Sequence, residues 1–207
     1  MTTSAEPEDA VAVRDAACLV LFADQPTAPR LLMGRRPADQ IFLPNTWVFP
    51  GGRVDACDHD AHVDDVAAAL PEVLRPFARA AIRELHEETG LTWRTTSNER
   101  DLRPLARAIT PPGRVRRYDT WFFISRYHSP TTGRFTGDGE LLDLAWFTID
   151  EARALDLPHI TRLVLDDAAD ALARPGARAA ESVPFYRTGP NGFERVLTTC
   201  RPAATPP

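Results

Sequence analysis

The sequence predicts an α/β fold built as one domain. Three observations indicate this class: short apolar runs of strand character are interspersed with two long helical patterns, no segment is repeated, and 207 residues suit a single domain. Hydrophobic residues make up 43% of the chain and charged residues 26%, an ordinary globular balance. We expect the domain at residues 13–198, between a disordered tail at 1–12 and a proline-rich tail at 199–207.

The expected elements follow one another along the chain. Apolar or aromatic runs bounded by turn residues predict strands at 17–22, 30–35, 47–49, 103–109, 120–127, 141–147, 183–187 and 193–197. Apolar spacings of three and four residues predict long helices at 76–89 and 158–173, and shorter ones are expected near 63–70 and from the capping box at 148–151. Pro76 suits the first turn of its helix, and Gly90 suits the left-handed residue just after it.

Composition excludes several classes of function. A net charge of −5 argues against a general nucleic-acid binder, because proteins bind the negatively charged phosphate backbone with a basic surface. The 24 cationic residues are all arginine, which excludes a lysine nucleophile, a Schiff base and a P-loop lysine. Three scattered cysteines without a C-x-x-C pair indicate a reducing compartment. Since neither a signal-peptide pattern nor an apolar run of membrane-spanning length is present, we expect a cytoplasmic protein that does not bind membranes.

The helix at 76–89 carries the strongest chemical signal. Glu84, Glu87 and Glu88 stand at i, i+3 and i+4, so they gather on an arc beside the apolar face. Carboxylates this close repel one another, and a divalent cation would remove that repulsion. Mg²⁺ prefers such hard oxygen ligands together with substrate phosphates, and Mn²⁺ is the alternative. We therefore expect a metal site here, with Arg83 one turn before Glu87 and able to pair with it.

These residues also carry a resemblance to a known family. The segment Arg83–Leu91 (RELHEETGL) matches the second half of the Nudix box, R-E-U-x-E-E-x-G-U with U aliphatic, at every fixed position. Gly51 and Gly52 resemble the glycines that open the box, and the likeness covers residues 15–175. The resemblance implies the Nudix fold, a mixed β-sheet sandwiched between helices. It also implies Mg²⁺-dependent hydrolysis of a pyrophosphate bond in a nucleoside diphosphate linked to another group.

The first half of the box departs from the family pattern. The pattern places a glutamate six residues after the glycine and eight before the arginine, but Gly52 and Arg83 are 31 positions apart instead of 14. The 17 additional residues indicate an insertion at residues 55–75. Position 75 is an arginine, and the residue six after Gly52 is Asp58. No early-box glutamate is therefore assigned.

The resemblance implies roles for individual residues. The implied metal ligands are Glu84, Glu87, Glu88 and the Gly52 carbonyl. Arg83 would orient these carboxylates, which makes it a catalytic candidate together with Glu87. Glu140 precedes the strand at 141–147 and is the candidate general base, although an acidic residue in a surface turn fits this position equally well.

A basic loop precedes the strand at 120–127. Arg114, Arg116 and Arg117 are candidates to clamp a substrate phosphate, because guanidinium groups bind phosphate bidentately. The alternative is a solvated loop that balances acidic neighbours. Simpler structural roles are expected for three other features: a solvated His86, an unpaired Cys57, and the core aromatic residues at 121–123.

Two further segments bear on the substrate. Residues 49–55 (FPGGRVD) and 116–123 (RRYDTWFF) resemble the coenzyme A diphosphatase branch of the family, which implies coenzyme A or acyl-CoA as substrate. An NADH or ADP-ribose pyrophosphatase is the alternative, because the same metal-binding helix serves different substrates and the surrounding loops determine which substrate is bound. The rival from another class is a non-catalytic Nudix ligand-binding module, which the intact carboxylates argue against. Many relatives dimerise, so a homodimer is expected.

Overall fold

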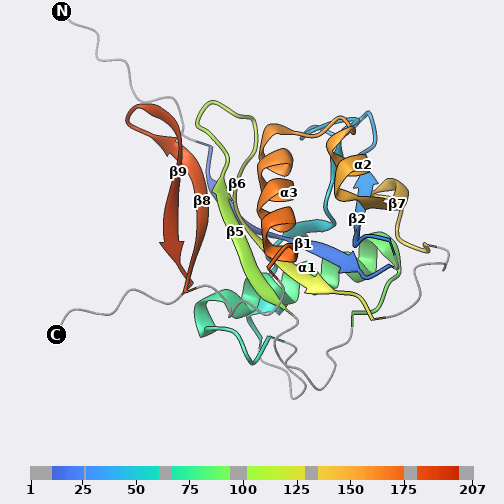
Figure 1. Cartoon of the computed structure of the whole chain (residues 1–207). Helices are drawn as coiled ribbons and strands as arrows, with labels where there is room; N and C mark the ends of the chain where they lie inside the picture. The colour runs from blue at the N-terminus through green and yellow to red at the C-terminus, as the bar shows by residue number, and fades with distance from the viewer. Residues whose placement is uncertain are drawn as a thin grey trace, which may run out of the picture.

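The computed structural model describes residues 11–25, 27–60, 67–93, 102–128, 135–174 and 181–200. Most of the expected tails, residues 63–66 of the expected helix near 63–70 and the turn at 131–133 lie outside these residues. Residues 67–70 form a turn rather than a helix. Within the described residues, nine strands form one mixed sheet with helices on both faces (Figure 1). None of the helices in this part of the chain has the length and apolar character that crossing a bilayer requires.

The strands are joined mostly in antiparallel pairs. They are β1 (Val13–Ala23), β2 (Arg30–Arg35), β3 (Trp47–Val48), β4 (Gly51–Arg53), β5 (Arg103–Ile109), β6 (Arg117–Arg126), β7 (Leu142–Thr148), β8 (Ser182–Gly189) and β9 (Gly192–Thr199). The order is β3-β2-β1-β6-β5-β8-β9, with β4 paired to β1 and β7 paired to β2. Strand β1 runs parallel to β6, and β5 runs parallel to β8. Each expected strand is present, with ends that differ by up to four residues.

Strand β1 organises the sheet around the later site. Its early residues Ala16–Cys18 pair with β4, and its last residues Phe22 and Ala23 pair with β2. Between these two ladders the Leu19 amide donates to the Pro50 carbonyl oxygen at 2.9 Å. The two glycines of β4 are therefore held against the middle of the sheet.

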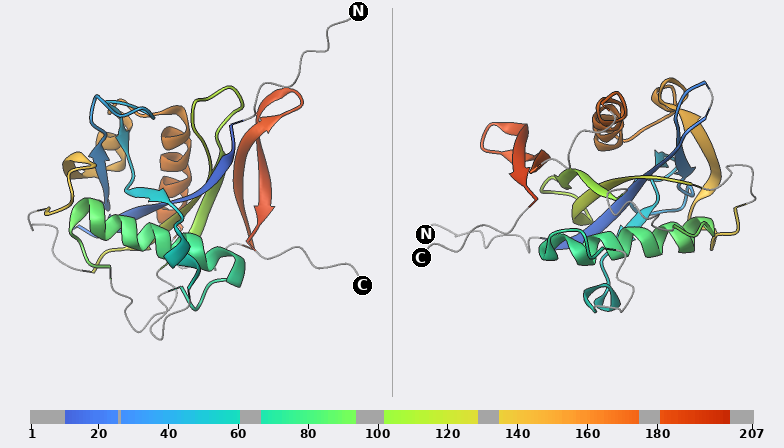
Figure 2. Two further views of the ribbon diagram at one scale, coloured as in Figure 1. Left: turned by 180° about the vertical axis from the view of Figure 1, so that it is seen from behind. Right: turned by 60° about the horizontal axis from the view of Figure 1, so that its bottom comes forward.

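The helices form two layers, one on each face of the sheet (Figure 2). Helix α1 (Arg75–Thr89) covers one face, whereas α2 (Ile149–Arg153) and α3 (His159–Leu172) cover the other. Phe123 packs in the apolar cluster that contains Leu85 of α1, while its neighbour Phe122 packs in the cluster that contains Val164 of α3. Consecutive strand residues point to opposite faces, so β6 serves both cores. The expected sandwich of a mixed sheet between helices is confirmed.

Some elements begin or end where the sequence pattern could not show it. Strand β1 starts at Val13 rather than 17, because residues 13–16 pair with β6 although the first three are exposed. The glycines at 51 and 52 form the short strand β4 together with Arg53. Two 3₁₀ helices, η1 (Ala56–His59) and η2 (Glu72–Leu74), flank the undescribed part of the insertion. The aromatic residues at 121–123 are buried, as expected.

Helix α1 ends where the sequence predicts. Gly90 has φ +74° and its amide donates to the His86 carbonyl oxygen at 2.7 Å. A side chain at this position would also overlap the Thr136 hydroxyl. Glycine is therefore required both by the backbone conformation and by the close approach of the 135–140 segment.

Replacing Gly90 with alanine tests this double requirement. We expect Gly90→Ala to lower the free energy of unfolding by roughly 3 kcal/mol, because left-handed strain and overpacking add. Gly113 is the matched control, since it has φ +78° but no atom near its Cβ position. Gly113→Ala should cost about 1 kcal/mol from strain alone. Equal losses in urea unfolding of the two variants would contradict the packing role of Gly90.

Candidate active site

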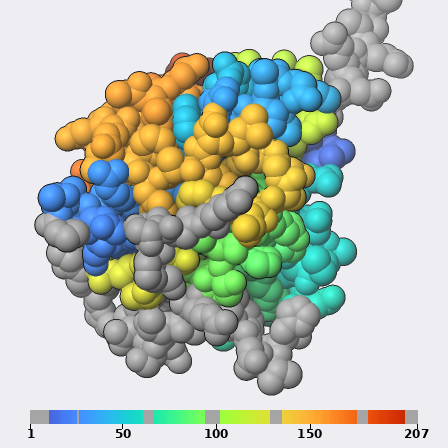
Figure 3. All heavy atoms as spheres, turned by 90° about the vertical axis from the view of Figure 1, so that its right-hand side faces the viewer, coloured from blue at the N-terminus to red at the C-terminus, as the bar shows by residue number. Residues whose placement is uncertain are grey.

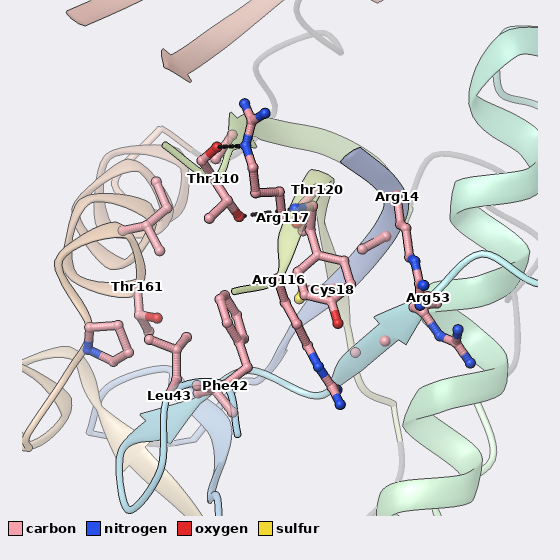
Figure 4. Close-up of a pocket in the computed structure, with 18 of the residues that line it drawn as sticks. Arg14, Cys18, Phe42, Leu43, Arg53, Thr110, Arg116, Arg117, Thr120 and Thr161 are labelled. Carbon is pink, nitrogen blue, oxygen red and sulfur yellow. Dashed lines mark hydrogen bonds between the residues drawn. The ribbon is translucent and has the colours of Figure 1, made fainter. Parts of the chain in front are cut away.

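A cavity of about 1240 Å³ lies between the acidic helix α1 and the first turn of α3 (Figure 4). Its walls also include β4, the loop at 40–44 and the loop at 110–117. We call it the central cavity. Its lining contains carboxylates mainly from α1 and the 138–140 segment, and arginines from several other elements.

Arg83 joins three carboxylates on one wall of the central cavity. Its Nη1 donates to Glu84 Oε1 at 3.0 Å and to Glu87 Oε2 at 2.9 Å. Its Nη2 donates to Asp58 Oδ2 at 2.9 Å and to the Arg53 carbonyl oxygen at 3.0 Å. These carboxylate hydrogen bonds raise the pKa of Arg83, so the guanidinium stays charged. The expected pairing with Glu87 is present, and the same group also fixes Glu84 and Asp58.

Asp58 is the functional residue that the sequence reasoning left unassigned. It lies in η1, is 4% exposed, and accepts from Arg83 with both carboxylate oxygens. The Asp55 amide also donates to Asp58 Oδ2 at 2.8 Å, which fixes the side chain within its own loop. A signal was present: Asp58 stands six residues after Gly52, where the box pattern has an acidic residue. The additional residues therefore follow Asp58 in the chain and leave its pairing intact.

The paired glycines allow helix α1 to approach β4 closely. A Cβ on Gly52 would overlap the Glu84 carboxylate, and a Cβ on Gly51 would overlap the Ala17 carbonyl oxygen and Cys18. The Gly51 amide donates to Glu88 Oε2 at 2.8 Å. Both glycines thus let backbone groups meet carboxylates directly, which larger residues would prevent.

The three carboxylates of α1 lie in different environments. Glu84 and Glu87 line the central cavity, but Glu88 does not, and it is only 2% exposed. Burial raises the pKa of Glu84, and it raises the pKa of Glu88 to about 8 against the opposing effect of the Gly51 amide. Glu88 therefore lies on the inward side of the expected arc, and its role as a metal ligand stays a prediction. Among the described residues, the second oxygen of each carboxylate has no hydrogen-bond partner.

The segment before β7 brings Glu140 to the same wall. In the space-filling view this yellow segment lies against green α1 (Figure 3). The Asp138 amide donates to the Glu87 carbonyl oxygen at 2.8 Å, and the Glu140 amide donates to Asp138 Oδ1 at 2.8 Å. Glu140 is exposed, lines the central cavity, and its charge contributes to the raised pKa of Glu84. Its position suits a group that acts on bound substrate, while its role as general base stays a prediction.

Arginines without carboxylate partners face this acidic wall. Arg114, Arg116 and Arg117 line the central cavity, as do Arg14, Arg36 and Arg53. Within the described ranges, none of these six makes an ion pair, although Arg83 beside them makes several. Eight arginines elsewhere are paired: Arg30 with Glu151, Arg35 with Asp143, Arg107 with Asp119, Arg126 with Asp24, Arg153 with Asp166, Arg174 with Asp170, Arg187 with Glu194 and Arg195 with Asp167. Two others, Arg75 and Arg162, donate to backbone carbonyl oxygens. The unpaired arginines of the cavity suit an anionic ligand.

The remaining candidates are peripheral. His86 is exposed as expected, and its Nδ1 lies 3.3 Å from the Leu91 carbonyl oxygen. Cys57 is an exposed free cysteine. In the part of the chain that the structure describes, no three His, Cys, Asp or Glu side chains converge tightly enough to hold a metal ion by themselves.

Comparison with known proteins decides the family. The model of the NUDIX domain matches residues 12–168, which is most of the chain. The chain belongs to the Nudix family. The putative nudix hydrolase 7 of Caenorhabditis elegans is 38% identical over 97 residues, covering 44% of this chain and 28% of that protein. The match thus spans less than a third of this Nudix relative's length.

Solved Nudix structures share the fold. A NUDIX hydrolase from Alicyclobacillus acidocaldarius superposes with a TM-score of 0.62 at 24% identity, covering 81% of this chain and 94% of that chain. The NUDIX domain of Shewanella oneidensis NrtR, in complex with ADP ribose, superposes with a TM-score of 0.57 at 14% identity, covering 83% and 99%. At these identities the likeness concerns the fold alone.

Removing the charge of Asp58 tests the Arg83 network. We expect Asp58→Asn to lower the free energy of unfolding by about 2 kcal/mol, because a buried hydrogen-bonded partner of a guanidinium is lost. Asp55 is the matched control: its Oδ2 lies 3.9 Å from Arg83 Nη2 and its side chain is 53% exposed. Asp55→Asn should change the stability by less than about 0.5 kcal/mol. Urea unfolding measures both, and similar small losses would rule out Asp58 as an anchor.

Proposed function

We propose that this chain hydrolyses the diphosphate bond of a nucleoside diphosphate derivative with the help of a divalent cation, Mg²⁺ or Mn²⁺. The observation that carries the proposal is the central cavity itself. One wall presents carboxylates held by Arg83, and the other walls present arginines without carboxylate partners. A diphosphate with a bound cation matches both charges, because its oxygens bind arginine and the cation binds carboxylate.

The donor set of α1 fits such a cation. Carboxylate oxygens are hard ligands, and Glu84, Glu87 and Glu88 each keep one oxygen without a hydrogen bond among the described residues. The Gly52 backbone adjoins the Glu84 carboxylate, so its carbonyl is the natural further ligand. The side chains alone form no closed cage, which suits Mg²⁺, since this ion uses few carboxylates and keeps water and substrate phosphates. When bound, it would neutralise the diphosphate and lower the pKa of an attacking water.

The protein's own residues position the reaction. Arg83 holds Glu84 and Glu87 in place, and the arginines of the cavity hold the diphosphate oxygens. The oxygen of a water forms a bond to one phosphorus while the bridging P–O bond breaks toward the leaving phosphate. Glu140 accepts the proton of that water, because it is an exposed carboxylate on the same wall. Phosphoryl transfer needs little covalent help beyond such positioning.

Coenzyme A or an acyl-CoA is the substrate we propose. The support is the resemblance of residues 49–55 and 116–123 to the coenzyme A diphosphatase branch, and both segments contribute to the central cavity. Its volume of about 1240 Å³ accommodates a ligand larger than a mononucleotide. NADH and ADP-ribose are the competing substrates, and ligand binding without turnover is the competing function.

A panel of diphosphates tests the activity and its metal dependence. Coenzyme A, NADH, NAD, ADP-ribose and Ap4A are incubated with the full chain in Mg²⁺, in Mn²⁺ and in a chelator. We expect turnover of at least one compound with either metal, and none with the chelator until metal is restored. Binding of ADP-ribose without turnover of any compound would instead establish a ligand-binding module.

Neutralising Glu87 separates catalysis from folding. We expect Glu87→Gln to lower kcat by at least about a hundredfold, because an accessible metal-binding carboxylate is lost. The thermal midpoint should stay near that of the wild type, since the Glu87 side chain is 47% exposed. Glu72 in η2 is exposed and lies outside the cavity, so Glu72→Gln is the control and should retain full activity. Full activity of Glu87→Gln would refute its role.

A further inference from the structure

The N-terminus of α3 opens into the central cavity without a cap. Its preceding residue is Pro158, which offers no side-chain acceptor, and no side-chain cap is formed. The much shorter α2 is capped, because Thr148 Oγ1 accepts from the Glu151 amide at 3.2 Å and Glu151 Oε2 accepts from the Thr148 amide at 2.8 Å. The first amides of α3 have no partner within their own helix, and residues 158–161 line the cavity. The positive end of a 14-residue helix dipole therefore faces this space.

Thr161 contributes a hydroxyl group at the same place. Thr161 is only 4% exposed, yet within the described part of the chain its side chain makes no hydrogen bond. It lines the central cavity, and its oxygen lies on the cavity side of α3 (Figure 4). No fully buried side-chain oxygen among the described residues lacks a hydrogen-bond partner, so the Thr161 hydroxyl keeps access to the cavity and is free to donate to a ligand.

The surroundings of this first turn favour a negative ligand. The carboxylates that line the central cavity come from α1, from the 138–140 segment and from the loop after β4, and none comes from α3 or from the 110–117 loop. That loop instead contributes Arg116, whose side chain extends into the space between α3 and β4 (Figure 4). The α3 end of the cavity is thus separate from the proposed metal site and opposite to it in charge.

We propose that the first turn of α3, with the Thr161 hydroxyl, binds a phosphate monoester that the substrate carries apart from its scissile diphosphate. This inference rests on the proposed function for the same cavity and names its substrate class. Amides at a helix N-terminus and a hydroxyl donor together recognise a phosphate dianion, and the arginines of the cavity add a positive potential. The enzyme therefore selects diphosphates whose ribose is phosphorylated, such as coenzyme A, over those without that group.

Binding of two product-like nucleotides tests the subsite without requiring turnover. Adenosine 3′,5′-bisphosphate and 5′-AMP differ by one phosphate monoester, and calorimetry measures their Kd with the full chain. We expect the bisphosphate to bind at least about tenfold more tightly. Thr161→Val should remove most of that preference because it keeps the shape and deletes the hydroxyl, whereas Thr161→Ser should keep it. Thr188 is exposed on β8 outside the cavity, so Thr188→Val is the control and should match the wild type.

A second pair links the subsite to catalysis. We expect kcat/KM for coenzyme A to exceed that for 3′-dephospho-coenzyme A by about tenfold or more, and Thr161→Val should lower this ratio toward one. Equal affinities of the two nucleotides, no measurable binding of either, or an unchanged preference in Thr161→Val would overturn the subsite. Absence of turnover with a retained affinity preference would instead sink the proposed hydrolysis while leaving the subsite in place.

Discussion

The guanidinium of Arg83 is the constraint on which the site depends. It pairs with the buried Asp58, and it restrains Glu84 and Glu87 through one nitrogen. Arginine suits this task because its planar group offers several donors in fixed directions and stays charged. Without it, two neighbouring carboxylates on α1 would repel and separate. The ion-pair network thus keeps an acidic wall intact before any cation or substrate arrives.

The sheet supports this network through residues that have no side chain. Strand β4 pairs with the first half of β1, which places Gly51 and Gly52 under helix α1. The helix approaches closely enough for the Gly51 amide to meet Glu88 and for Glu84 to rest on Gly52. Glu88 therefore acts as a tie between helix and sheet, in addition to any contact with a cation. Its raised pKa follows from that burial.

The sequence predicted the parts of the site that depend on residues close together in the chain. It missed the parts that depend on contacts between residues far apart in the chain. The motif at Arg83–Leu91 correctly predicted helix α1 and the capping Gly90, because both depend on neighbouring residues. The spacing put Glu88 on an arc with Glu84 and Glu87 but did not show its burial, although Glu88 stands seven residues after the buried Ala81 and so shares its face. The pairing of Asp58 with Arg83 joins residues 25 positions apart across an insertion, so the spacing of Asp58 from Gly52 marked an acidic position but not its partner.

The start of α3 shows a different kind of limit. Stability alone would favour Ser, Thr, Asp or Asn before a helix, since such a cap contributes about 1 kcal/mol. The chain instead has Pro158 there, while it caps the five-residue α2 fully. Three residues after Pro158, the Thr161 hydroxyl borders the cavity and makes no hydrogen bond among the described residues. A sequence pattern shows only that a helix begins. The cavity in front of α3 shows why an uncapped start is tolerable, because an anionic ligand there can accept hydrogen bonds from the first amides of the helix. The acidic wall close to α1 lies on the opposite side and cannot supply that acceptor.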